Sequence, residues 1–212
     1  ASDRDILSIH MSSGLSGTYN SSLAAAQLVP EANITHVDTK TLSAAAGWQV
    51  VSAARAIKAG WPTEKVLELV AQISAASDSM YTLKDLKYLI HGGRISHMKG
   101  LIASLLHIKP LIGVEKVNGT YVQMGQARAF KGALTKLVSL MKKHYAEGTK
   151  LRVQVLYSHN PESAATLREK IDPFFDCTWL PVGPLSLVLG AHTGPSMVGV
   201  AFAPLSAFDA VP

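Results

Sequence analysis

Short apolar segments alternate with helical segments along the first 83 residues, and this alternation limits the folds that the chain can adopt. The expected strands are Ile6–His10, Ile34–Asp38 and Met80–Leu83, and the expected helices are Tyr19–Val29, Leu42–Ala59 and one that begins at Thr63. In the third helix, apolar residues recur at i, i+3, i+4 and i+7: Val66, Leu69, Val70 and Ile73. Strands that alternate with helices predict βαβ units and a parallel sheet covered by helices.

The second half of the chain shows a different pattern. Two β-type segments flank Asn118-Gly119, a dipeptide that predicts a hairpin turn with positive φ at both residues. Further elements are expected in this half: a helix with Leu134, Leu137, Val138 and Met141 on one face, a strand from Leu151 to Tyr157, a helix that starts at Asn160-Pro161, a strand Asp176–Val182, a helix Leu185–Gly190 and a strand Met197–Phe202. This half is expected to contain antiparallel pairing.

The predicted fold class is α/β with two lobes. The first lobe, residues 1–84, is of the parallel βαβ type, and the second, residues 108–212, has a mixed sheet that includes the antiparallel hairpin. Residues 85–107 contain a helical pattern interrupted at Gly92-Gly93, and we interpret them as the connection between the lobes.

Composition excludes several classes of protein. Hydrophobic residues make up 48% and charged residues 17%, so the chain has too much apolar material and too little charge to remain unfolded. A single cysteine, Cys177, cannot form an internal disulfide, which favours the cytoplasm. The net charge of +5 is not gathered into a basic stripe, so we expect no nucleic-acid binding. Prolines and glycines interrupt the long uncharged stretch 180–208, so we expect no stable membrane insertion.

A loop rich in serine and glycine follows the first expected strand. Hydroxyls of Ser13, Ser16 and Thr18 can donate hydrogen bonds, Gly17 lets a ligand approach the backbone, and the next helix begins with unpaired N–H groups. Such a loop at the carboxyl end of a strand is a typical binding place for an oxyanion. The alternative is that these hydroxyls only cap the helix.

Other catalytic and metal-binding patterns are missing from the sequence. It contains no G-x-S-x-G, no P-loop and no dinucleotide fingerprint, and its eight histidines lack the spacing of metal ligands. The segment His91-Gly92-Gly93-Arg94 fits a helix C-cap or an arginine beside a ligand. Similarly, His192 could face a pocket or be structural, and Arg128 could bind an anion or a surface carboxylate.

Five ordered motifs together resemble the DegV family of bacterial fatty-acid-binding proteins. They are Ser13-Gly14-Leu15-Ser16-Gly17-Thr18-Tyr19; Asp38-Thr39-Lys40 with Ser43 and Gly47; Leu86-Lys87-Tyr88-Leu89 with Gly92-Gly93-Arg94-Ile95; Ile108-Lys109-Pro110; and His192-Thr193-Gly194-Pro195. The resemblance covers almost the whole chain. It implies two α/β lobes that close over one fatty acid, and it implies no cofactor and no catalytic residue. A separate fatty acid kinase would phosphorylate the carboxyl group to an acyl phosphate, which places the protein in phospholipid metabolism.

The resemblance also assigns site residues. Ser13, Ser16, Gly17 and Thr18 match the loop beside the fatty acid head group, and His192 with Thr193 would reach the same group from the second lobe. Arg128 matches a basic residue that often follows the hairpin. Family members usually have a further α/β segment before the serine-rich loop, so we expect this chain to associate with such a segment or with a second chain.

Two other functions remain open. The chain could be a subunit of the dihydroxyacetone-kinase type that binds a small triose covalently through His192. It could also be a degenerate form of the fold that is retained for protein interaction. A triose needs a small polar cavity, whereas an acyl chain needs a long apolar one.

Overall fold

The structure is a computed structural model of the 212-residue chain, and it describes residues 5–97 and 108–212. Two compact units are present. The first comprises Ala1–Ala75, Glu115–Thr120 and Val211–Pro212, and the second comprises Ala76–Val114 and Tyr121–Ala210.

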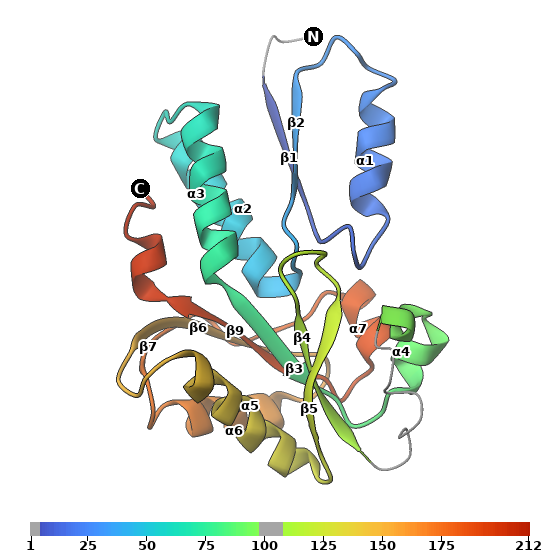
Figure 1. Cartoon of the computed structure of the whole chain (residues 1–212), viewed down its shortest axis with the longest axis vertical. Helices are drawn as coiled ribbons and strands as arrows, with labels where there is room; N and C mark the ends of the chain where they lie inside the picture. The colour runs from blue at the N-terminus through green and yellow to red at the C-terminus, as the bar shows by residue number, and fades with distance from the viewer. Residues whose placement is uncertain (1–4, 98–107) are drawn as a thin grey trace. The chain divides into compact units, whose positions relative to one another are not determined.

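The first unit is a small α/β layer. Its elements are β1 (Ile6–His10), α1 (Thr18–Ala26), β2 (Ile34–Asp38), α2 (Ser43–Lys58) and α3 (Thr63–Ala76). β1 and β2 pair in parallel, with Ile6 opposite Ile34 and His10 opposite Asp38. α1 covers one face of this two-stranded sheet, and α2 and α3 lie on the other (Figure 1). The expected parallel βαβ arrangement is therefore confirmed for this unit.

Packing in the first unit is concentrated on α2 and α3. The apolar face predicted for α3 is confirmed, because Val66, Leu69, Val70 and Ile73 are all buried. Trp48 of α2 is also buried, at 3% exposure. Neither strand of the sheet contains a fully buried residue, and α1 contains none.

The second unit is built on a seven-stranded mixed sheet. Its elements are β3 (Asp78–Thr82), α4 (Lys87–His91), the 3-10 helix η1 (Arg94–His97), β4 (Lys109–Val114), β5 (Tyr121–Ala127), α5 (Phe130–His144), β6 (Lys150–Tyr157), α6 (Pro161–Ile171), β7 (Asp176–Trp179), β8 (Gly183–Pro184), α7 (Leu187–Thr193), β9 (Val198–Pro204) and the 3-10 helix η3 (Leu205–Phe208). The strand order is β5-β4-β3-β9-β6-β7, with β8 also paired to β6. β7 and β8 run parallel to β6, and the other pairs are antiparallel.

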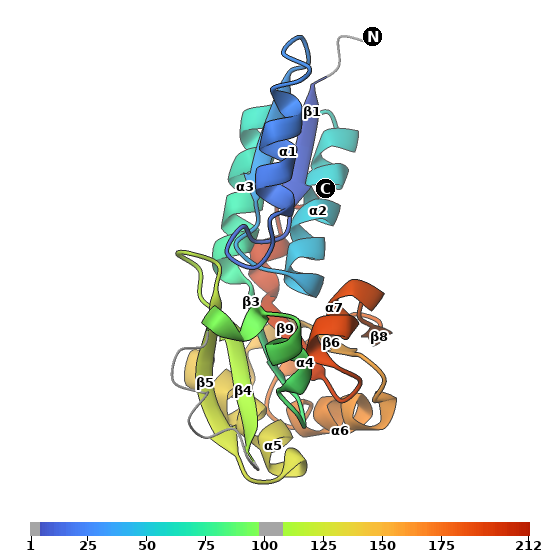
Figure 2. The same ribbon diagram turned by 90° about the vertical axis from the view of Figure 1, so that its right-hand side faces the viewer.

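One face of this sheet carries the main core. α5 and α6 pack against it, and alternate residues of β6 and β9 fill the interface (Figure 1). The predicted faces of α5 and β6 are confirmed: Leu137, Met141, Leu151 and Val153 are fully buried. The predicted start of α6 is also confirmed, because the side chain of Asn160 accepts a hydrogen bond from the Ser163 N–H at 3.3 Å. α4 and α7 form a separate helix pair that Figure 2 shows side by side.

The position of β3 differs from the sequence-based expectation. The sequence pattern predicts this strand in the first lobe, but it pairs with β4 and β9 in the sheet of the second unit, antiparallel to both. The residue pattern of a segment can predict that the segment is a strand, but it does not indicate which distant strand will pair with that segment. The units therefore do not follow the expected ranges 1–84, 85–107 and 108–212. In the expected connection, α4 and η1 belong to the second unit, and residues 98–107 lie outside the described residues.

Two local predictions also need correction. The antiparallel hairpin is confirmed, but its loop is longer than the predicted two-residue turn and spans residues 115–120; Gly119 has φ of +69° and Asn118 has a negative φ. α7 ends three residues later than expected, so His192 and Thr193 are helical. The Ser186 hydroxyl accepts a hydrogen bond from the Leu189 N–H at the start of α7, and Gly194 ends the helix with φ of +78°.

Candidate ligand-binding site

The predicted serine and glycine residues lie together between β1 and α1 of the first unit. The Ser16 and Thr18 hydroxyl oxygens are 2.7 Å apart, and the Thr18 N–H donates to Ser16 Oγ at 3.2 Å. Gly17 is the exposed N-cap residue of α1 and supplies no side-chain cap. Hydroxyl groups and helix N–H groups thus lie together at an exposed helix N-terminus, where they can hydrogen-bond an anion. The same hydrogen bonds also fit the capping alternative.

Asp38 orders this loop from the neighbouring strand. Its Oδ1 accepts hydrogen bonds from the Ser13 N–H at 3.2 Å and the Lys40 N–H at 3.0 Å, and its Oδ2 forms an ion pair with Lys40 Nζ at 3.0 Å. Burial alone would raise the pKa of the Asp38 carboxyl, but hydrogen bonds from Ser13 and Lys40 outweigh this effect and lower it. Asp38 is therefore a carboxylate at neutral pH. Since its oxygens are already engaged, its role here is to position Ser13.

Sequence reasoning assigned no role to Ser12, although this residue is completely buried in the same loop. Its hydroxyl donates to the Gly119 carbonyl at 2.8 Å and accepts from the Gly14 N–H at 3.1 Å. Gly119 is 107 residues away in sequence, so no local pattern could have indicated the contact. By contrast, Asp38 is part of one of the five motifs, and a role beside the loop could have been assigned to it, because it ends the strand parallel to the one that leads into the loop.

His192 and Thr193 occupy the last turn of α7 in the second unit. The Thr193 hydroxyl donates to the Leu189 carbonyl at 2.9 Å and the residue is 1% exposed, so in this conformation the hydroxyl serves its own helix. His192 is half-buried against α4: a Cβ added to Gly92 would lie 2.5 Å from His192 Nδ1. Any side chain at position 92 would therefore displace the imidazole.

The Gly-Gly-Arg segment at the end of α4 has a structural role. The Gly93 N–H donates to the Ile90 carbonyl, Gly93 has φ of +71°, and Arg94 Nη1 donates to the Gly92 carbonyl. These features are typical of a helix C-cap, which was one of the two interpretations of this motif. The glycines also let α4 approach α7, where His192 lies.

Arg128 follows the last residue of β5 and is exposed. It lies on a different element from His192 and Thr193. The predicted site residues thus fall into a serine-rich loop in the first unit, the end of α7 in the second unit, and an exposed arginine after the hairpin.

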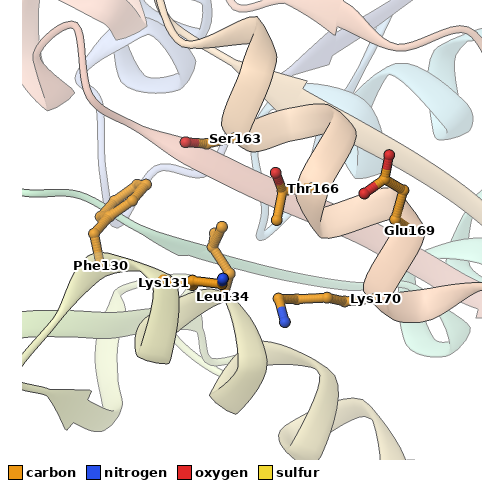
Figure 3. A pocket seen from close by; sticks show the side chains of 7 residues that line it. All are labelled: Phe130, Lys131, Leu134, Ser163, Thr166, Glu169 and Lys170. Carbon is orange, nitrogen blue, oxygen red and sulfur yellow. The ribbon is translucent and has the colours of Figure 1, made fainter.

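Three surface cavities are formed by other residues. A groove of about 650 Å³ lies between α5 and α6, lined by Phe130, Lys131, Leu134, Ser163, Thr166, Glu169 and Lys170 (Figure 3). Cavities of about 400 Å³ and 390 Å³ lie in the first unit, one lined by Val37, Asp38, Gln49 and residues of α3, the other by residues of β1, β2, α2 and α3. Within residues 5–97 and 108–212, none of these three is lined by a predicted site residue.

Two further observations bear on the type of site. Among the described residues, no group of three or more His, Cys, Asp or Glu side chains is arranged to hold a metal ion. In the same part of the chain, no helix has the length and apolar character needed to cross a membrane.

Comparison with known proteins identifies the family. The model of the DegV family, described as uncharacterised proteins, matches residues 1–205. A DegV domain-containing protein from Deinococcus radiodurans is 36% identical over 203 residues, which is 96% of this chain and 70% of that protein.

Solved structures agree with this assignment. A Thermotoga maritima protein whose structure is described as revealing fatty acid binding function has a TM-score of 0.82 and 27% identity, over 96% of this chain and 70% of its own. A fatty-acid-binding DegV family protein from Thermus thermophilus has a TM-score of 0.81 and 29% identity, over 95% of this chain and 71% of its own. By sequence and by fold, the chain belongs to the DegV family.

Proposed function

We propose that this protein binds a long-chain fatty acid and presents its carboxyl group to a separate kinase that forms an acyl phosphate. The observation that carries the proposal is the similarity to fatty-acid-binding DegV structures over about 95% of the chain. In this role the protein is a carrier, and the kinase supplies the chemistry.

The serine-rich loop supports the head-group half of the proposal. Ser13, Ser16 and Thr18 offer hydroxyls, and the N-terminus of α1 offers N–H groups and positive potential. These groups suit a carboxylate, and they suit the more highly charged acyl phosphate equally well. We assign His192 to the same head group, as the member of the second unit that the family resemblance indicates.

Affinity would come mainly from the hydrocarbon tail. Burying about fourteen methylenes at about 0.8 kcal/mol each gives roughly 11 kcal/mol before the cost of ordering the chain. Ordering the tail and losing its translational freedom offset much of this gain. The head-group contacts then mainly set the orientation of the ligand.

The first test is direct detection of the ligand. The protein is expressed in a bacterial host, purified, denatured and extracted, and the extract is analysed by mass spectrometry. We expect about one fatty acid per chain. Extracts without fatty acid, together with no binding of added hexadecanoic acid in native mass spectrometry, would refute the binding proposal.

A second test separates presentation from binding. We expect His192→Ala to lower the rate at which a fatty acid kinase with ATP phosphorylates bound hexadecanoic acid by about tenfold, and to change lipid retention by less than twofold. Ser139→Ala on α5 is the matched control, because Ser139 is exposed and its hydroxyl donates to the Thr135 carbonyl of the same helix. If His192→Ala and the control behave alike, the head-group role of His192 is wrong.

A further inference from the structure

Ser12 is the hydrogen-bonding centre of the serine-rich loop. The residue is 0% exposed, and its own N–H donates to the Thr41 carbonyl at 2.8 Å. Its carbonyl accepts the N–H groups of Leu15 and Ser16, each at 3.1 Å, which closes the turn that leads into α1. Its hydroxyl donates once, to Gly119, and accepts once, from Gly14. The single O–H donor of Ser12 is therefore engaged inside the protein and is not available to a ligand.

The tip of the β4–β5 hairpin, Glu115–Thr120, is packed directly against this turn within the first unit. A Cβ on Gly14 would lie 2.3 Å from the Asn118 carbonyl oxygen, and a Cβ on Gly119 would lie 1.9 Å from Ser12 Oγ. Real Cβ atoms do not approach other atoms so closely, so glycine is needed on both sides of the contact. The tip and the loop fit each other without space for a side chain.

The tip is itself held in one conformation by Glu115. Its carboxylate accepts hydrogen bonds from the N–H groups of Val117 at 2.8 Å, Asn118 at 2.9 Å and Thr120 at 3.2 Å, and from the Thr120 hydroxyl at 3.0 Å. Burial opposes ionisation of Glu115, but these hydrogen bonds together outweigh it and lower the pKa of the carboxyl group. A loop with this many internal bonds can act as a fixed surface for its neighbour.

We propose that the hairpin tip positions the serine-rich loop for head-group binding, with Ser12 as the positioning residue that joins them. The ligand part of this inference rests on the proposed function. Hydrogen-bond donors recognise a carboxylate only when they are held to within about 0.5 Å of the productive geometry. Ser12 supplies that precision for Ser13 and Ser16 and does not itself touch the ligand.

The test compares two ligands that differ only in the head group, hexadecanoic acid and its methyl ester. The ratio of their dissociation constants measures head-group recognition, because the tail contribution is common to both. We expect Ser12→Ala to reduce the preference for the acid by about five- to tenfold, and to change ester binding by less than twofold. Amide hydrogen exchange should accelerate at Gly14, Leu15 and Ser16.

Two further variants distinguish loss of positioning from misfolding: one perturbs the tip, and the other is a control. Glu115→Gln loosens the tip without altering the loop, and should reduce the preference for the acid by about two- to threefold. Ser22→Ala in α1 is the matched control and should leave both ligands unaffected, since its hydroxyl donates only to the Tyr19 carbonyl. Equal weakening of acid and ester binding would indicate a merely structural role and overturn the inference.

The outcomes also separate this inference from the proposed function. If the unaltered protein prefers the acid and both Ser12→Ala and Glu115→Gln keep that preference and the exchange rates of the loop, positioning by the tip is wrong while fatty acid binding stands. If the unaltered protein binds neither ligand, the proposed function is wrong, and the ligand part of the inference is wrong with it.

Discussion

The sheet of the second unit is enclosed by apolar side chains, whereas the sheet of the first unit is not. In β9, six consecutive residues from Val198 to Ala203 are buried, so this strand is covered on both faces of the sheet. Residues of α5 and α6 pack against one of these faces and form the main core with it. In β1 and β2, no residue is fully buried, and α1 contains none either. Hydrogen bonds to Asp38 and Ser12 instead fix the serine-rich loop. The serine-rich loop is therefore fixed largely by polar contacts, and the buried apolar residues of the first unit lie mainly on α2 and α3 rather than on its sheet.

This difference has a consequence for stability. A two-stranded sheet with partly exposed faces contributes little on its own, since three or more strands with a covered face are usually needed. Elements with few buried apolar contacts open at lower free energy than core strands. We therefore expect the sheet and the serine-rich loop of the first unit to open more readily than the sheet of the second unit.

The largest effect is expected for Phe202→Ala in β9. Phe202 is 0% exposed within the main core, so its removal leaves a cavity and should lower the free energy of unfolding by about 3–5 kcal/mol. Urea denaturation followed by circular dichroism measures this change. If the free energy of unfolding fell by less than about 1 kcal/mol, the core of the second unit would not be the main source of the protein's stability.

Hydrogen exchange should separate the two sheets without any mutation. Amides of β1 and β2 should exchange roughly a hundredfold faster than those of β6 and β9, because only the latter require opening of the enclosed core. Exchange followed by mass spectrometry of peptides resolves these segments. Equal protection of β1 and β9 would contradict the comparison.

Asp38→Asn should have a smaller effect, limited to the first unit. The amide keeps the shape of the side chain but loses the ion pair with Lys40 and weakens the hydrogen bonds from Ser13 and Lys40. The expected loss is about 1–2 kcal/mol at neutral pH. Exchange of β2 and the serine-rich loop measures it, and Asp5→Asn near the start of β1 is a control that leaves this network intact.

The same carboxylate predicts a pH dependence. The pKa of Asp38 is lower in the folded protein than its ordinary value of 3.8, so its stabilising contribution is complete above that value. The contribution is lost as the pH falls through the lowered pKa. The difference between the unaltered protein and Asp38→Asn should therefore shrink below about pH 4, and a difference that grows in acid would show that the assigned sign is wrong.

Local signals in the sequence predicted most elements, because they arise from neighbouring residues. The apolar faces of α3 and α5 follow the helical period, and Asn160 with Pro161 marks the start of α6. The pairing of β3 could not be predicted, because β9 is more than 100 residues away. The serine-rich loop was located from composition and position, but Ser12 depends on a partner 107 residues distant. The sequence therefore did not predict contacts between distant segments, and one of these, from Ser12 to Gly119, helps to order the loop.

The smallest effect is expected for Leu23→Ala in α1. Leu23 is 37% exposed and α1 buries no residue fully, so the substitution removes little buried apolar surface. Alanine also has the higher helix propensity, which offsets part of the loss. We expect a change below about 1 kcal/mol, measured by the same urea denaturation. Leu137→Ala in α5 is the matched leucine, at 0% exposure, and should cost about 3 kcal/mol. Similar costs for the two leucines would mean that α1 is packed as tightly as α5, and the contrast between the units would then not extend to their helices.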